Sequence, residues 1–162
     1  MAVIKLVNDP YYNEDALDNM FHYLASQNDL LNDTSSPANF MGGCNYILYD
    51  INSIADQFKY VKQHFHKTDK SQLIHFIISF PSNELKSMNK ARGFANFICS
   101  KFSCNYQILY AIHHKPNNLH IHFILNTISF TDGSYFYQKN GLPGRLCYET
   151  NYYFGREIAR YA

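Results

Sequence analysis

The chain has 162 residues, 46% of them hydrophobic and 17% aromatic, so it can bury a core of its own and is expected to form one domain over residues 1–162. It lacks an apolar run of roughly 20 residues, a signal-peptide pattern and C-x-x-C spacing among its four cysteines, which argues against a membrane span, secretion and a zinc knuckle. The formal net charge is +1, but it is unevenly distributed: residues 1–58 hold one basic and eight acidic residues, and residues 59–162 hold thirteen basic and five acidic ones. The basic second part of the chain suits contacts with phosphate groups.

The N-terminal residues predict a strand followed by an amphipathic helix. Residues 2–7 read as a strand, and Asn13 is a candidate N-cap for the helix. At about 100° per residue, Tyr23 lies about 110° to 120° from the middle of the apolar stripe, so we expect its phenol to reach an open site. The stripe consists of Leu17, Met20, Phe21 and Leu24.

The rest of the chain predicts alternating loops, strands and helices. Residues 26–43, rich in Asn, Asp, Ser, Pro and Gly, predict a long loop, and a second, glycine-rich loop is expected at 139–145. The order of the elements indicates an α+β domain with a central antiparallel β-sheet and helices packed on it. The other predicted elements are strands at 45–49, 73–80 and 106–112, helices at 53–65 and 81–102, a turn at 131–133 and a helix from about residue 150.

Three of the four histidines in the segment IHHKPNNLHIHFILN, namely His113, His120 and His122, give the strongest chemical signal. Side chains alternate along a strand, so His120 and His122 leave the same face about 7 Å apart. The turn residues at 115–118 lie between two apolar runs and predict a β-hairpin that brings His113 beside His120. Three imidazoles placed in this way can bind one metal cation and leave positions open for water or substrate.

The chain resembles the MobA/MobL-like (MOBP-type) relaxases of the HUH endonuclease superfamily, in which a hydrophobic residue separates two metal-binding histidines. In this chain the hydrophobic residue is Ile121. Four blocks occur in the family's order and span nearly the whole chain: ALDNMFHYL, MGGCNY, LIHFIISFPSNE and HHKPNNLHIHFILNTISFTDGSYF.

The resemblance implies metal-assisted transesterification of DNA. The Tyr23 oxygen would attack a phosphate of single-stranded DNA, a 3′-hydroxyl would leave, and the 5′-phosphate would stay bound to the tyrosine until religation. The metal and His75 are both candidates for activating the phenol. The implied site consists of Tyr23 and His75 as catalytic residues, His113, His120 and His122 as metal ligands, and Ser79 and Asn126 at the DNA.

The resemblance also implies a cofactor, partners and a cellular setting. The cofactor would be a divalent metal ion, Mg²⁺ or Mn²⁺, and the setting the bacterial cytoplasm during mobilisation of a plasmid or conjugative element. The DNA would be an origin-of-transfer nick site and its adjacent hairpin, accessory relaxosome proteins are candidate partners, and no membrane is involved. Independently of the resemblance, Phe40, Tyr135 and Tyr137 are candidates for stacking on unpaired bases.

Lys115 departs from the family pattern, because relaxases commonly carry an acid two residues after the first histidine. The carboxylate that would orient a ligand imidazole is therefore missing or supplied from elsewhere. Three alternatives remain open. One is a replication initiator or transposase of the HUH superfamily with a nucleophile among Tyr148, Tyr152 and Tyr153. The others are an inactive relative that binds single-stranded DNA, and a metal-dependent hydrolase that activates water and tolerates loss of the Tyr23 phenol.

Overall fold

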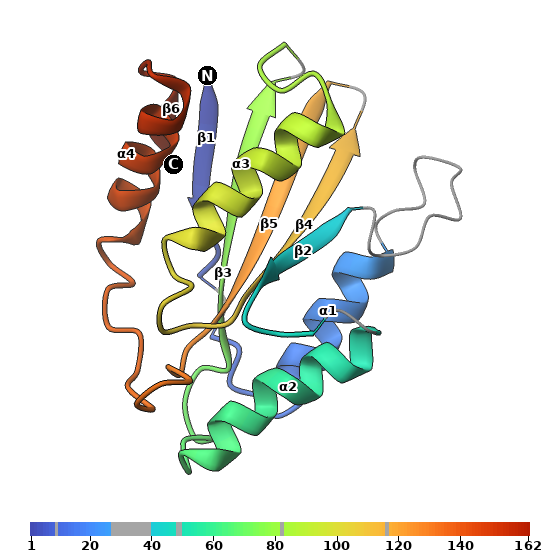
Figure 1. Ribbon diagram of the computed structural model, residues 1–162, viewed down its shortest axis with the longest axis vertical. Coiled ribbons are helices and arrows are strands. Elements are labelled where there is room, and N and C mark those ends of the chain that lie inside the picture. The colour runs from blue at the N-terminus through green and yellow to red at the C-terminus, as the bar shows by residue number, and fades with distance from the viewer. Residues whose placement is uncertain (9, 27–39, 48–49, 82, 116) are drawn as a thin grey trace.

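A computed structural model describes residues 1–8, 10–26, 40–47, 50–81, 83–115 and 117–162 (Figure 1). The described residues form six strands and four helices in the order β1 (Ala2–Leu6), α1 (Ala16–Ser26), β2 (Met41–Cys44), α2 (Ile51–His64), β3 (Leu73–Pro81), α3 (Met88–Ser100), β4 (Ile108–Lys115), β5 (Asn118–Asn126), α4 (Leu142–Phe154) and β6 (Ala159–Tyr161).

The strands form one sheet in the order β2-β4-β5-β3-β1-β6. Neighbours from β2 to β1 pair antiparallel, and β4 and β5 are directly connected as a hairpin. At the far edge, β6 runs parallel to β1, which makes the sheet mixed. The predicted α+β class is therefore confirmed, and the expected antiparallel arrangement applies to every pair except β1–β6.

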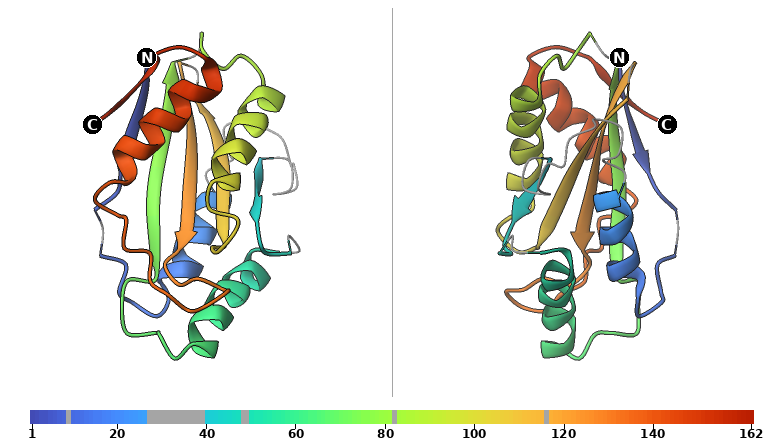
Figure 2. Two further views of the ribbon diagram at one scale, coloured as in Figure 1. Left: turned by 60° about the vertical axis from the view of Figure 1, so that its left-hand side comes forward. Right: turned by 90° about the vertical axis from the view of Figure 1, so that its right-hand side faces the viewer.

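Two hydrophobic clusters cover opposite faces of the sheet. The larger cluster joins α3 and α4 to one face through residues such as Phe94, Leu146 and Phe123. The smaller one joins α1 and α2 to the other face through Phe21, Phe58 and similar residues. In Figure 2 (left), α3 and α4 lie in front of the sheet and α1 lies behind it. Alternation along β5 decides which cluster receives each side chain.

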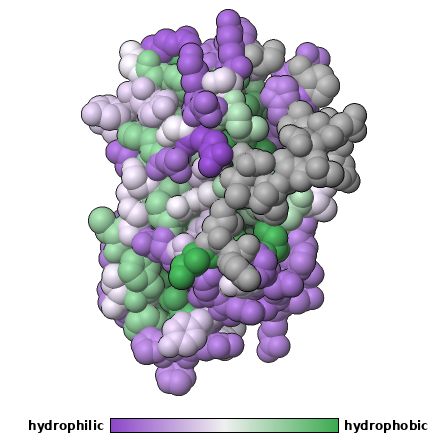
Figure 3. Space-filling model, turned by 45° about the vertical axis from the view of Figure 1, so that its right-hand side comes forward, coloured by the Kyte–Doolittle hydropathy of each residue, from purple (hydrophilic) through white to green (hydrophobic). Residues whose placement is uncertain are grey.

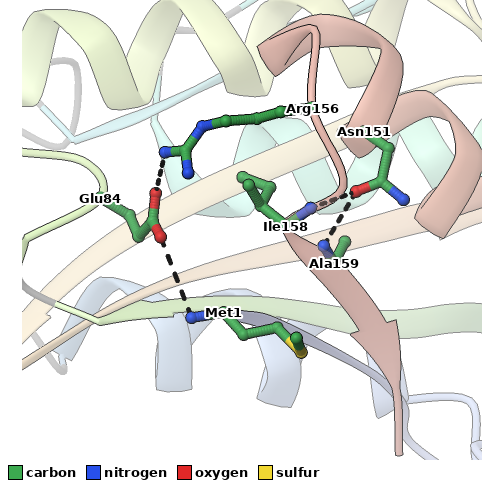
Figure 4. Close-up of polar contacts among 6 residues, drawn as sticks. All are labelled: Met1, Glu84, Asn151, Arg156, Ile158 and Ala159. Atoms are coloured by element: carbon green, nitrogen blue, oxygen red, sulfur yellow. Dashed lines mark hydrogen bonds and ion pairs between the residues drawn. The ribbon is translucent and has the colours of Figure 1, made fainter.

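The edge strand β6 is tied to α4 and to the N-terminus by polar contacts (Figure 4). The Asn151 side-chain oxygen accepts hydrogen bonds from the backbone N–H groups of Ile158 and Ala159, at 2.8 and 2.9 Å. Glu84 forms ion pairs with Arg156, at 2.6 Å, and with the Met1 amino group, at 3.9 Å. These contacts position a strand of three residues that would gain little stability from its own pairing.

Several boundaries differ from the predicted ones. The strand predicted at 45–49 lies earlier, at Met41–Cys44, and its first three residues fall within the predicted 26–43 loop. A pair of glycines made this segment look like a loop, but a Cβ at Gly42 would come within 2.5 Å of the Tyr110 hydroxyl, so the close approach to β4 requires glycine. Residues 27–39 and 48–49 lie outside the described residues.

The two helices on the larger cluster also begin at unexpected residues. The helix predicted from 81 begins only at Met88, because the Ser87 side chain caps it by accepting a hydrogen bond from the Lys90 N–H at 3.2 Å. The C-terminal helix begins at Leu142, within the predicted 139–145 loop, with a proline in its first turn. Tyr135 forms an isolated antiparallel bridge with Ile128, and residues 135–137 lie outside the named strands.

The helices and the surface were compared with what a membrane span would need. No helix in the described parts of the chain is long and apolar enough to cross a bilayer. Hydrophobic and hydrophilic residues are interspersed on the face shown in Figure 3.

Candidate active site

The predicted histidine hairpin is confirmed, and its register brings the three histidines together. His113 on β4 lies directly opposite His120 on β5, and His120 lies opposite Ser79 on β3. His122 follows two residues later on the same face, with its ring centroid 4.7 Å from that of His113. The sheet therefore presents these side chains on the face that carries α1 and α2, and away from α3 and α4.

Each of the three histidines makes a hydrogen bond through one ring nitrogen. Nδ1 of His120 lies 2.9 Å from the Ser79 hydroxyl, and Nδ1 of His122 lies 3.0 Å from Nε2 of His75. Nε2 of His113 donates to the backbone carbonyl of Leu24 at 3.0 Å. Among the described residues, the second nitrogen of each ring makes no hydrogen bond.

A fourth histidine and a tyrosine extend this arrangement. The other ring nitrogen of His75, Nδ1, lies 3.2 Å from the Tyr11 hydroxyl. Tyr11 has a left-handed backbone conformation with φ of 45°, which is costly for a tyrosine and is held by a hydrogen bond from the Gln72 N–H to its carbonyl. Sequence patterns do not report such a conformation, so Tyr11 was missed. A continuous chain therefore runs from Tyr11 through His75 to His122.

Burial keeps the histidines neutral. Loss of solvent lowers the pKa of His75 to about 4 and that of His122 to about 3. The pKa values of His113 and His120 are also lowered, mainly by burial, and the nearby Lys115 ammonium lowers them further. A neutral imidazole has a lone pair for a metal or a proton, so these rings are chemically ready to act as ligands near pH 7.

The imidazole nitrogens of this cluster are of a chemical type that binds divalent metal ions. Neutral imidazoles with one nitrogen fixed by a hydrogen bond and the other uncommitted are the usual state of metal-binding histidines. Within the described residues, however, no three His, Cys, Asp or Glu side chains are arranged to hold a metal ion, so the imidazole nitrogens do not converge on one metal position. Binding of one metal ion by His113, His120 and His122 would thus require at least one of these rings to shift.

Tyr23 lies on α1, outside the buried stripe, as the helical spacing predicted. Its side chain is 48% exposed, whereas Leu17, Phe21 and Leu24 on the same helix are fully buried. The next residue, Leu24, receives the His113 hydrogen bond, which connects this end of α1 to the histidines. Tyr23 also lines a cleft of about 350 Å³ together with Tyr11, the partner of His75.

The two predicted DNA contacts have different positions. Ser79 is half-buried beside His120 at the edge of the histidine cluster. Asn126 is fully buried, and its amide donates to the Phe58 carbonyl at 3.1 Å and to the Gln107 side chain at 2.8 Å. The Asn126 amide thus joins α2 to the sheet, and we do not include it among the proposed DNA contacts.

Comparison with known families identifies the family of this chain. The family model described as relaxase, MobA/VirD2-like, nuclease domain matches residues 23–145, which are 123 of the 162 residues. The match begins at Tyr23 and includes all three clustered histidines. Comparisons with curated proteins and with solved structures gave no significant match. Because the family model covers most of the chain, the protein belongs to the MobA/VirD2-like relaxases and contains their nuclease domain.

Proposed function

We propose that this relaxase nicks and religates one strand at an origin of transfer, with Tyr23 as the nucleophile. One observation carries the proposal: His113 of the histidine cluster is hydrogen-bonded to Leu24, the residue that follows Tyr23 on α1. This contact connects an exposed phenol to a group of neutral imidazoles on the adjoining face of the sheet. Strand transfer at phosphorus needs the nucleophile to lie near the groups that would hold a charge-stabilising metal ion, and the neutral imidazoles are suited to that task.

The reaction is a transesterification at phosphorus. The Tyr23 oxygen attacks the scissile phosphate, the bond to the 3′-oxygen breaks, and the departing oxygen takes up a proton to become a 3′-hydroxyl. The 5′-phosphate remains on Tyr23 as a phosphodiester, so the bond energy is conserved for religation. A divalent ion bound by His113, His120 and His122, Mg²⁺ or Mn²⁺ in this proposal, would supply charge stabilisation at the non-bridging oxygens.

His75 is better suited to positioning than to proton transfer. Both of its ring nitrogens have partners, His122 and Tyr11, and its pKa of about 4 makes it a weak base near neutral pH. If Nε2 of His122 serves as a ligand, Nδ1 carries the proton and donates to His75. We therefore assign to His75 the task of holding the His122 ring, which replaces the orienting carboxylate that is absent at Lys115.

The proposed substrate is single-stranded DNA at the nick site beside the origin hairpin, in the bacterial cytoplasm, with accessory relaxosome proteins as further partners. Ser79 lies at the edge of the histidine cluster, where its hydroxyl can contact the phosphate backbone. A basic second half of the chain favours such contacts.

The position of α4 argues against the rival nucleophiles. Tyr152 and Tyr153 lie on α4, where their rings pack against Phe97 on α3. Both helices cover the face of the sheet opposite to the histidines. An enzyme using these tyrosines would have to bring the DNA phosphate around the sheet to the other side.

The test is formation of a covalent protein–DNA adduct. The protein is incubated with a labelled origin oligonucleotide and Mn²⁺, and denaturation-resistant adducts are separated by gel electrophoresis. We expect Tyr23→Phe to abolish the adduct and the matched exposed control Tyr60→Phe to retain it. Loss only with Tyr152→Phe or Tyr153→Phe would support a C-terminal nucleophile. Cleavage that survives Tyr23→Phe would indicate a hydrolase, and binding without any adduct would indicate an inactive relative.

A further inference from the structure

A second cavity, which we call the Tyr135 cavity, lies at the end of the sheet where β3 begins and β5 ends. It has a volume of about 240 Å³, and its lining includes Tyr12, Lys70, Tyr135, Tyr137 and Lys139. It is thus built from three segments that are distant in sequence, and it combines aromatic rings with cationic side chains.

Positive charge is concentrated around one of these rings. The ammonium groups of Lys67 and Lys70 lie 4.9 and 4.6 Å from the centroid of the Tyr135 ring. The Tyr135 hydroxyl donates to the carboxylate of Asp69 at 3.3 Å, and Lys139 also borders the cavity. Three lysines against one aspartate leave a net positive site, which favours a ligand that carries negative charge.

The other rings are available to a ligand. Tyr137 is 82% exposed and Tyr12 is 64% exposed, although aromatic rings usually bury most of their surface. Tyr137 makes an edge contact with Tyr135, with ring centroids 6.1 Å apart. The faces of two tyrosines are therefore open beside a cationic cavity, and this combination suits stacking of an unpaired base with its phosphate nearby.

The loop that carries Tyr135 is held in place before any ligand arrives. Its backbone forms hydrogen bonds of 2.9 Å between the Ser129 N–H and the Ser134 carbonyl, and between the Phe136 N–H and the Thr127 carbonyl. The Lys67 ammonium donates to the carbonyl of Gly133, whose φ of 70° permits the turn. A fixed loop loses little conformational entropy when it binds a ligand.

Tyr12 connects this cavity to the candidate active site. Its side chain lines both the Tyr135 cavity and the cleft along α1 that Tyr23 lines. The only charged side chain lining that cleft, among the described residues, is Asp15, so the positive charge for a phosphate is found in the Tyr135 cavity rather than beside Tyr23.

We propose that the Tyr135 cavity binds an unpaired nucleotide of the DNA strand at a distance from the scissile phosphate. The base stacks on the open faces of Tyr137 and Tyr12, and Lys70 and Lys139 contact the phosphate. This inference rests on the proposed function, because it assumes that the strand passes Tyr23. The Tyr135 cavity would then be a second binding site for the DNA strand, beyond the cleft along α1.

The experiment measures fluorescence anisotropy of labelled oligonucleotides with metal-free protein, so that binding is separated from cleavage. One oligonucleotide covers only the nick site, and two others extend from it in the 5′ or the 3′ direction. We expect Tyr137→Ala to weaken binding of one extended oligonucleotide roughly tenfold or more and to leave the short one unchanged. The stacking-competent Tyr137→Phe variant and the exposed control Tyr161→Ala are expected to bind like the original protein.

A second variant tests the phosphate contact. Lys70→Ala is expected to reduce the slope of log affinity against log salt by about 0.7 for the same extended oligonucleotide. Equal losses for short and extended oligonucleotides, unchanged binding with Tyr137→Ala, or competition by the matching duplex would each overturn the inference. Covalent adduct formation on the short oligonucleotide reports on Tyr23 separately, so failure of the proposed function can be told apart from failure at this cavity.

Discussion

Lys62 offers a quantitative test of the fold, because it is a lysine buried to 2% exposure on α2. Its ammonium donates to the Thr127 hydroxyl at 2.7 Å, and burial lowers its pKa to about 7. An unfolded lysine has a pKa of about 10.4, so between pH 7 and 10.4 the unfolded chain binds more protons than the folded one. The free energy of unfolding should therefore rise with pH through this window.

The magnitude follows from the two pKa values. Between the two pKa values, each pH unit changes the free energy of unfolding by about 1.36 kcal/mol. Because half of the folded molecules are protonated at Lys62 near pH 7, burial of this lysine lowers the free energy of unfolding at that pH by about 4 kcal/mol, a loss that we call the burial penalty. Lys62→Met removes this penalty and loses one hydrogen bond worth about 1 kcal/mol. The Thr127 hydroxyl keeps its donation to the Ser71 carbonyl at 2.7 Å. We expect the variant to be about 3 kcal/mol more stable at pH 7.

Urea unfolding at pH 7, 8.5 and 10 measures this difference, with the exposed Lys90→Met variant as control. The gain in Lys62→Met should shrink as the pH rises, since the original protein loses its penalty. If Lys62→Met were less stable than the original protein at pH 7, or if the difference did not depend on pH, the reasoning about desolvation would be refuted.

Two further substitutions separate positioning from binding. Tyr11→Phe removes the hydroxyl that contacts His75, which in turn holds the His122 ring, and we expect a loss of Mn²⁺ affinity of about tenfold by calorimetry, the low end for groups that orient a ligand, with unchanged affinity for single-stranded DNA. An unchanged Mn²⁺ affinity would remove Tyr11 from the site. Asn126→Ala leaves the Phe58 carbonyl and the Gln107 side chain without their donor and should lower the unfolding free energy by about 2 to 3 kcal/mol in urea, while DNA affinity is retained. Weaker DNA binding at full stability would instead indicate a direct contact.

The features that could be predicted from the sequence depend on local patterns. Alternation and a turn signal defined the β4–β5 hairpin and its register, and helical spacing separated Tyr23 from the buried stripe. These signals depend only on residues close together in the chain, so they can be recognised without knowledge of the rest of the fold.

The features that were missed depend on contacts between distant segments. The strand β6 is held in place by Asn151 and β1. Gly42 lies in a strand because it pairs with Tyr110 on β4, and it is a glycine because Tyr110 leaves no room for a side chain. The contact between Tyr11 and His75 needs a left-handed backbone, which tyrosine seldom adopts. No pattern within a short window reports any of these three contacts.

The strands that carry the histidines and the helix that carries Tyr23 are anchored in different ways. His113, His120 and His122 lie on β4 and β5, and each of these strands is paired on both sides within the sheet. Tyr23 lies on α1, which rests on this sheet through buried side chains and the bond between His113 and Leu24. Local opening begins where backbone hydrogen bonds do not cross between elements. We therefore expect α1, with Tyr23, to change position more readily than the strands that carry the three histidines when single-stranded DNA binds.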